Sequence, residues 1–411
     1  MHTLAFIRPL LFTLFAVAVM VTSARAADNG ETALTWTSKA TGEVLRVAIH
    51  EPAIVDAAAP TAVPTVIYLL NLAAPRVGTD SDETILIDFM KQGFRVITLD
   101  YAKNPKARVP ALNVDLGKLR DDIYTGKFPY QGKLDQAHIY IVPSGHRLLR
   151  DIVFYRDRER TLAFDVIYPS RPAKPTGVVL EFSCDNKDRF GNSSLSMCSD
   201  TILDAEATEG LAVAMADHPV AAPYKGLDPM PDCAWKIKSA VRTLRTTARN
   251  LGLGEKVVPV GFSRGSGMAL MLVTTANMKD FEGHGEHLDI DSSVQGAVVM
   301  SGRFTYLDLL KDDHMISRYE KAWGTRDSAT DKWRKHGALD YLQKPTVPIF
   351  LTINCSESPD ALHQMEVLRR RLTELKSPFT YLLDDHPRGH KVTLEPALLS
   401  AMDAYIKSRL L

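Results

Sequence analysis

The chain has 411 residues, of which 45% are hydrophobic and 24% are charged. Its 49 Lys and Arg residues balance its 49 Asp and Glu residues, so the formal net charge at pH 7 is zero. Because the sequence contains no basic run, the composition argues against nucleic acid or an anionic membrane surface as a partner. It favours small molecules or neutral polymers.

Residues 1–26 have the features of an export signal. Arg8 supplies a positive charge near the start, residues 10–21 form an apolar stretch too short to span a bilayer comfortably, and residues 24–26 form a small-x-small cleavage site. We expect cleavage before Ala27 and a mature chain that is periplasmic or secreted. No later stretch approaches about 18 uninterrupted apolar residues, so no membrane contact is expected after cleavage. The alternative is a retained N-terminal anchor.

Residues 27–135 predict a smaller α/β region. Its expected strands are 34–36, 44–49, 65–70 and 94–100, its expected helices are 83–92 and 114–124, and the Ala/Pro-rich segment 52–64 is expected to be a loop. The strand, helix, strand, helix order over 65–124 repeats the order expected over 177–250. We interpret this region as a partial copy of the second half that lacks a nucleophile. The alternative is a generic α/β segment whose order is coincidental.

Residues 136–411 predict a larger α/β domain. Two antiparallel strands are expected at 150–156 and 161–168, followed by strands at 177–183, 211–216, 256–262, 294–301, 346–353 and 379–383, and by helices at 195–209, 233–250 and 394–410. Apolar strands that alternate with helices indicate an open, mostly parallel sheet with flanking helices. In this order the strand 256–262 is central.

The turn after that central strand has the sequence Gly261-Phe262-Ser263-Arg264-Gly265, and a small-residue helix follows it. This is the layout of a nucleophile elbow. The serine lies on a strained strand-to-helix turn, and the flanking glycines leave room where a Cβ would collide with the strand or the helix. The alternative is an ordinary glycine-rich turn, but the position between strand and helix favours the elbow. The motif predicts acyl transfer through Ser263.

With this elbow and this order of elements, residues 147–411 resemble the esterase and lipase branch of the α/β-hydrolase fold. The resemblance implies that an acid and then a histidine follow Ser263 in chain order, each after a strand. The loop after the strand 346–353 offers Glu357 and Asp360. Glu357 is favoured because it lies early in this loop, as the acid does in the family. Asp360 is the alternative, although it is also suited to cap the next helix.

The loop after the last predicted strand supplies two candidates for the base. It has the sequence Asp385-His386-Pro387-Arg388-Gly389-His390. We favour His390, because family histidines often follow a glycine in this loop. There the imidazole must reach Ser263 with one nitrogen and the acid with the other. His386, which precedes a proline, is the alternative.

The resemblance also implies an oxyanion hole with two backbone N–H donors. One is expected at Arg264, at the start of the helix after the elbow, where the helix dipole favours developing negative charge. The family usually takes the second from a His-Gly-Gly loop. Here the strand 177–183 leads into Cys184 and Asp185, with no glycine before Gly191. These two residues are our candidates for the second donor.

Residues 303–344 form an insertion at the position where family members place a lid or cap. It is rich in charged residues and in aromatic residues, which either stack on a sugar or aryl substrate or form the core of the insertion itself. The aromatic residues are Phe304, Tyr306, Tyr319, Trp323, Trp333 and Tyr341.

The chain has four cysteines, which an exported protein can pair in three ways. We favour a bridge between Cys198 and Cys233, because both are expected on loops or helix ends on one side of the elbow. Cys184 and Cys355 each follow a strand near the expected site. They are either bridged or free buried thiols.

The sequence therefore predicts an exported serine esterase in which Ser263 attacks the ester, His390 transfers the proton and Glu357 holds the imidazole. The resemblance suggests a small-molecule ester or an acylated polysaccharide as substrate. No metal or organic cofactor is implied, because His386 and His390 are separated by a Pro-Arg-Gly loop rather than spaced along a helix face. A serine peptidase on the same fold, and a binding protein that has lost catalysis, are the alternatives. The oligomeric state does not follow from the sequence.

Overall fold

The computed structural model describes the chain from Leu34 to Leu411 with some gaps. The gaps are residues 53–62, 73–79, 102–114, 116–117, 120, 124, 131–133, 135–138, 159, 173, 183–188, 190–210, 220–230 and 392–393. The expected export signal, most of the expected loop at 52–64 and the expected helix at 195–209 therefore lie outside the described residues. Cys184, Asp185 and Cys198 lie outside them as well.

A five-stranded sheet lies in the N-terminal part of the chain, in the order β1-β2-β4-β3-β5. Its strands are β1 (Thr35–Thr37), β2 (Val44–His50), β3 (Thr65–Leu70), β4 (Arg95–Asp100) and β5 (Ile139–Pro143). β3 pairs in parallel with β4 and β5, whereas β2 is antiparallel to β4. Alternate side chains of β3 pack against helix α1 (Asp82–Lys91) on one face and around Trp36 on the other. Successive side chains of a strand point to opposite faces of the sheet, so a strand that is covered on both faces contributes apolar residues to both cores.

An eight-stranded sheet follows, in the order β13-β12-β11-β10-β8-β9-β7-β6. Its strands are β6 (His146–Arg156), β7 (Thr161–Pro169), β8 (Val178–Phe182), β9 (Ala212–Ala216), β10 (Val257–Phe262), β11 (Ala297–Met300), β12 (Ile349–Asn354) and β13 (Phe379–Asp384). Neighbouring strands from β13 to β9 are parallel, and β7 pairs antiparallel with both β9 and β6. This arrangement confirms the predicted α/β class and the mostly parallel sheet. The change from one sheet to the other lies between Pro143 and His146.

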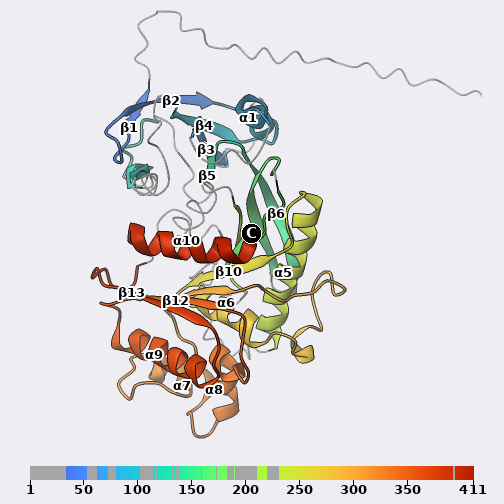
Figure 1. The fold of residues 1–411 in the computed structure, drawn as a ribbon, viewed down its shortest axis with the longest axis vertical. Helices are drawn as coiled ribbons and strands as arrows, with labels where there is room; N and C mark the ends of the chain where they lie inside the picture. The colour runs from blue at the N-terminus through green and yellow to red at the C-terminus, as the bar shows by residue number, and fades with distance from the viewer. Residues whose placement is uncertain are drawn as a thin grey trace, which may run out of the picture. The chain divides into compact units, whose positions relative to one another are not determined.

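Helices cover both faces of the eight-stranded sheet. On one face α5 (Asp232–Asn250), α6 (Arg264–Thr274) and α9 (Pro359–Glu374) share a core with alternate strand residues, and on the other α10 (Pro396–Leu410) closes a second core. Figure 1 shows α10 on one side of the sheet and α6 and α9 on the other. β10 is buried along its whole length, because a central strand covered on both faces must be apolar throughout. None of the described helices combines the length and the apolar character that crossing a membrane requires.

The insertion contains helices α7 (Ile316–Trp323) and α8 (Thr330–His336), and its aromatic residues pack on one another. The rings of Tyr319 and Trp323 stack at 4.8 Å, and Trp333 meets Trp323 edge to face at 5.4 Å. These three side chains are only 3%, 5% and 1% exposed. Phe304 belongs to the main core of the sheet. The described aromatic contacts therefore favour the interpretation in which the insertion builds its own core.

Candidate active site

Ser263 lies in the turn that joins β10 to α6. Its backbone has φ 54° and ψ −117°, a conformation that a residue with a side chain rarely adopts. The turn is so tight that a Cβ on Gly261 would lie 2.2 Å from the carbonyl oxygen of Gly265. Only glycine fits there without a shift of the backbone. The strained turn places the Ser263 hydroxyl at the N-terminus of α6 and at the carboxyl edge of the sheet.

His390 lies in the loop between β13 and α10 and reaches this hydroxyl. Its Nε2 is 2.9 Å from Ser263 Oγ, and its ring packs on the ring of Phe262 with the centroids 4.6 Å apart. The N–H of Gly389 donates to Ser356 Oγ at 2.7 Å, which ties the histidine loop to the loop after β12. The imidazole is 47% exposed. It therefore borders solvent on the side from which a substrate can approach.

Glu357 contacts the other nitrogen of the same imidazole. His390 Nδ1 lies 2.8 Å from Glu357 Oε1 and 3.0 Å from Oε2, and the glutamate side chain is only 2% exposed. Burial alone raises the pKa of this carboxyl, but hydrogen bonds from His390 and Ser301 outweigh it and leave the pKa below its usual value. Glu357 is therefore an ionised acceptor that selects the tautomer with the proton on Nδ1.

Asp360, the alternative acid, lies one turn further along and makes different contacts. Its carboxylate accepts from Arg303 Nη2 at 3.5 Å and lies 3.0 Å from His314 Nδ1. Among the described contacts none joins it to His390. The N-cap of α9 is Ser358, whose Oγ accepts from the N–H of Ala361 at 3.3 Å. In the described contacts, the side chain of Asp360 thus neither reaches the imidazole of His390 nor caps α9.

His386, the alternative base, is held by its own loop. Its Nδ1 lies 3.0 Å from Asp385 Oδ1 and 3.8 Å from Asp384 Oδ1. Its carbonyl oxygen accepts from Asn354 Nδ2 at 2.7 Å. The side chain is 60% exposed. The described contacts of His386 are therefore with residues at the ends of β12 and β13, and none of them reaches Ser263.

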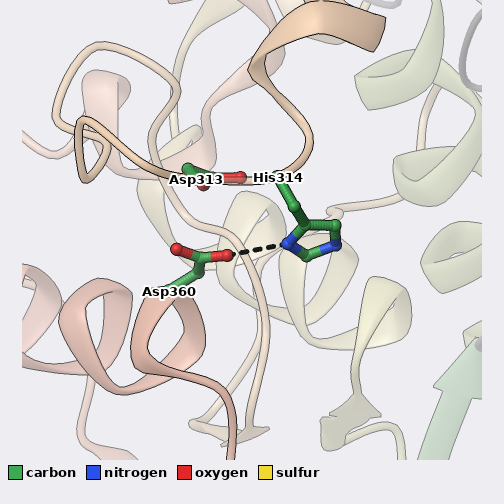
Figure 2. Close-up of side chains that lie close together, drawn as sticks. All are labelled: Asp313, His314 and Asp360. Atoms are coloured by element: carbon green, nitrogen blue, oxygen red, sulfur yellow. Dashed lines mark hydrogen bonds and ion pairs between the residues drawn. The ribbon is translucent and has the colours of Figure 1, made fainter.

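Asp313, His314 and Asp360 form a cluster whose potential ligand atoms lie within 4.8 Å of one another. Figure 2 shows the His314 ring directed at Asp360, with Asp313 beside it. The guanidinium of Arg303 donates to Asp313 Oδ1 at 2.9 Å and also to Asp360. Because Arg303 is already paired with both carboxylates, the cluster has the pattern of an ion-pair network rather than that of a metal site.

One of the expected oxyanion donors lies among the described residues. Arg264 is the first residue of α6, so its backbone N–H belongs to the first turn, where no carbonyl of the same helix accepts it. Its position next to Ser263 and the positive end of the helix dipole suit a developing negative charge. Cys184 and Asp185 lie outside the described residues. β8, the strand before them, ends at Phe182 and is the parallel neighbour of β10.

Two serines near the site were not singled out from the sequence. Ser266 Oγ donates to the carbonyl oxygens of Ser263 and Ser301, the latter at 2.8 Å. Ser301 directly follows β11 and places its Oγ 3.4 Å from His390 Nδ1. The only sequence signal for Ser301 is its place at the end of the strand next to β10, and a serine after an apolar strand is too common to be noticed alone.

Cys233, which we expected to pair with Cys198, is a free thiol in the structure. It lies at the start of α5, is 1% exposed, and its Sγ is 3.3 Å from Met268 Sδ. Burial raises the pKa of this thiol to about 12. The expected bridge is therefore wrong for Cys233, because the residue packs inward against α6 instead of facing a loop. Cys355 is also free and is partly exposed.

The comparisons with known proteins address the fold. A sequence model of the family described as BD-FAE matches residues 189–372. This range includes Ser263 and Glu357 and ends before His390. No match is found among curated proteins.

Several solved structures are similar to this chain. A truncated form of a carbohydrate esterase from gut microbiota has a TM-score of 0.54 at 15% identity, covering 64% of this chain and 95% of that chain. A bifunctional GH43-CE protein of Bacteroides eggerthii has a TM-score of 0.53 at 18% identity, covering 64% of this chain and 35% of that chain. The native Est2 esterase of the Planctomycetes species Thermogutta terrifontis has a TM-score of 0.49 at 16% identity, covering 64% and 91%. The two structures with TM-scores above 0.5 therefore show an α/β-hydrolase fold in this chain, as its resemblance to the esterase and lipase branch of that fold predicted.

Proposed function

We propose that the protein hydrolyses carboxylic esters through an acyl-enzyme formed on Ser263. The observation that supports this most directly is the chain of hydrogen bonds from Ser263 through His390 to Glu357, at 2.9 Å and 2.8 Å. It joins a nucleophile, a base and an acid that orients the base, which are the groups that acyl transfer requires. A similar structure described as a carbohydrate esterase supports the same class of reaction.

In the first half-reaction Ser263 Oγ attacks the ester carbonyl carbon while His390 Nε2 accepts the hydroxyl proton. The carbonyl oxygen becomes an oxyanion, towards which the N–H of Arg264 donates. When this intermediate collapses, the bond to the leaving oxygen breaks and Nε2 returns its proton to that oxygen. An alcohol leaves, and the acyl group stays on Ser263.

In the second half-reaction water takes the place of the alcohol. His390 Nε2 accepts a proton from the water as its oxygen attacks the acyl carbon, and the same proton returns to Ser263 Oγ when the acyl–serine bond breaks. A carboxylic acid is released. Glu357 accepts the Nδ1–H throughout and stabilises the imidazolium that forms in each half. Its lowered pKa keeps it ionised for this role.

The substrates that we propose are small-molecule esters or acylated polysaccharides. The formal net charge of zero fits a neutral polymer better than a strongly charged one. The two structures with the higher TM-scores are described as a carbohydrate esterase and as a bifunctional GH43-CE protein. A peptide substrate is the competing possibility, because the same three residues also serve amide hydrolysis.

Hydrolysis of short-chain aryl esters, combined with covalent labelling, tests this proposal. We expect turnover of the esters, and we expect a fluorophosphonate to abolish it while labelling a single peptide that contains Ser263. Digestion and mass spectrometry identify the labelled residue. Faster cleavage of peptide anilides than of esters would assign a peptidase instead. A folded protein that neither hydrolyses esters nor takes the label would be a binding protein.

We also propose that the protein is exported and that residues 1–26 are removed. The charged start, the short apolar stretch and the small residues before Ala27 support this. We expect protein recovered from the periplasm or the medium of an expressing bacterium to begin at Ala27, as read by N-terminal sequencing or intact mass. Recovery of the uncleaved chain in the membrane fraction would show a retained anchor.

A further inference from the structure

Ser301 occupies a position next to the nucleophile that parallels the position of Ser263 itself. The two residues follow neighbouring parallel strands, β11 and β10, whose last residues Met300 and Phe262 are register partners. Both have positive φ, 44° at Ser301 and 54° at Ser263. A backbone of this kind is retained only where the surroundings determine it, and such residues are concentrated at functional sites.

The backbone of Ser301 is held from several sides. Its N–H donates to the carbonyl oxygen of Thr352 on β12 at 3.2 Å, and its own carbonyl oxygen accepts from Ser266. A Cβ on the next residue, Gly302, would lie 2.2 Å from Ser266 Oγ and 2.7 Å from the carbonyl oxygen of Ser263. The chain after β11 is therefore packed closely against the elbow. This packing determines where the Ser301 side chain points.

The Ser301 hydroxyl is directed at the pair formed by His390 and Glu357. Its Oγ lies 3.4 Å from His390 Nδ1, the atom that contacts both carboxylate oxygens of Glu357, and the residue as a whole is 1% exposed. Donation from this hydroxyl is one of the causes that hold the pKa of Glu357 below its usual value. The proton on Nδ1 already serves the shorter bonds to Glu357, at 2.8 Å and 3.0 Å. The hydroxyl proton of Ser301 is therefore available for donation to Glu357.

We propose that Ser301 is a positioning residue that donates a hydrogen bond to Glu357 and holds its carboxylate in the orientation that accepts His390 Nδ1–H. This inference rests on the proposed esterase function, because it assigns Ser301 a role within the same reaction. Hydrogen bonds to an ionised carboxylate are the strong ones in proteins. Ser301 acts only through Glu357 and His390, and it does not itself transfer a proton.

Among the other charged groups near the pair, Asp384 and Arg303 have partners of their own. Asp384 and Lys391 line the same small hollow as Ser301 and Glu357. Asp384 accepts from Asn354 Nδ2 at 2.9 Å and from Arg388 at 3.4 Å. On the other side Arg303 is paired with Asp313 and Asp360. A substitution of Ser301 removes no partner from any of these charges, so a changed pH dependence in the variant reports on the hydroxyl.

The test is the pH profile of kcat/KM for an aryl ester with Ser301→Ala. We expect about a 10-fold loss and an acid limb that moves up by about half to one pH unit. The direction follows because the lost donor had stabilised the unprotonated pair. Without it the pair binds a proton at higher pH, whichever of the two residues takes the proton. Ser301→Gly removes the same hydroxyl but suits the positive φ, so it keeps the test valid if the alanine variant fails to fold.

Ser239→Ala is the matched control. Ser239 is also fully buried and donates to the carbonyl oxygen of Phe154, away from the site. We expect this variant to lose stability against urea without a shift of the acid limb, because it removes a buried hydroxyl that does not touch Glu357 or His390.

The outcomes separate this inference from the function on which it rests. If the protein hydrolyses esters and both Ser301 variants keep the acid limb of the unaltered protein, the positioning role is overturned and the esterase proposal stands. If the protein hydrolyses no ester, the proton NMR resonance of His390 Nδ1–H still tests whether Ser301 donates to Glu357. That resonance should move in Ser301→Ala, and an unmoved resonance would overturn the inference.

Discussion

We expect Ser263→Ala to reduce kcat/KM for aryl esters by about 10⁴- to 10⁶-fold, because no other group can form the acyl-enzyme. The loss should lie mainly in kcat, since the substitution removes a nucleophile and leaves the surrounding site unchanged. Stopped assays at high enzyme concentration measure the residual rate. The fluorophosphonate label should be lost in the same variant.

The stability of this variant is its internal control. The Ser263 side chain contacts His390 Nε2 in the described structure. Alanine has a Cβ, as serine does, so the strain of the positive φ at this position is the same in the variant. We therefore expect the free energy of unfolding in urea to change by less than about 1 kcal/mol. A variant that is folded and still hydrolyses esters at more than about a hundredth of the original rate would exclude Ser263 as the nucleophile.

We expect Glu357→Gln to lower kcat by about 10³- to 10⁴-fold. The side chain keeps its shape, but an amide that turns its NH₂ group to the imidazole favours the tautomer with the proton on the wrong nitrogen. It also removes the negative charge that stabilises the imidazolium. Asp360→Asn is the matched control, because its carboxylate contacts Arg303 and His314, and we expect its kcat to stay within about 3-fold. The reverse pattern would transfer the acid role to Asp360.

The pH dependence of stability gives Glu357 an independent readout. Its folded pKa lies below the usual value of 4.5. The contribution of the ionised carboxylate to stability is therefore fully present above that value and is lost as the pH falls through the lower, folded pKa. In Glu357→Gln this part of the acid sensitivity should be absent. Urea unfolding between about pH 3 and pH 6 measures the difference.

The sequence predicted the central sheet well, because the signals were local. The strands β9 to β12 are short apolar runs separated by helical segments, which is the pattern expected of parallel strands buried on both faces. The elbow was also a local signal, since Gly261 and Ser263 are two residues apart and their requirements follow from one tight turn. β5 was missed because a run of five residues is too short for its periodicity to distinguish a strand.

The cysteine prediction failed for a different reason. A bridge between Cys198 and Cys233 was inferred from their expected places in loops, but the direction of a side chain at a helix start depends on what packs against that helix. Cys233 faces α6 and contacts Met268. The residues around Cys233 in the sequence do not indicate which element its side chain will face.

The amino-acid sequence by itself determined the α/β-hydrolase class, the elbow at Ser263 and the two loops that hold the candidate partners, because each depends on short-range patterns. Only the tertiary structure decided which carboxylate and which imidazole meet. Glu357 and Asp360 are three residues apart, and His386 and His390 are four apart, so composition and spacing barely distinguish them. The loops after β12 and β13 lie beside the elbow, where Glu357 contacts His390. The side chain of Asp360 instead contacts Arg303. Ser301 was hidden from the sequence for the same reason, because its contact with His390 depends on the packing of neighbouring strand ends.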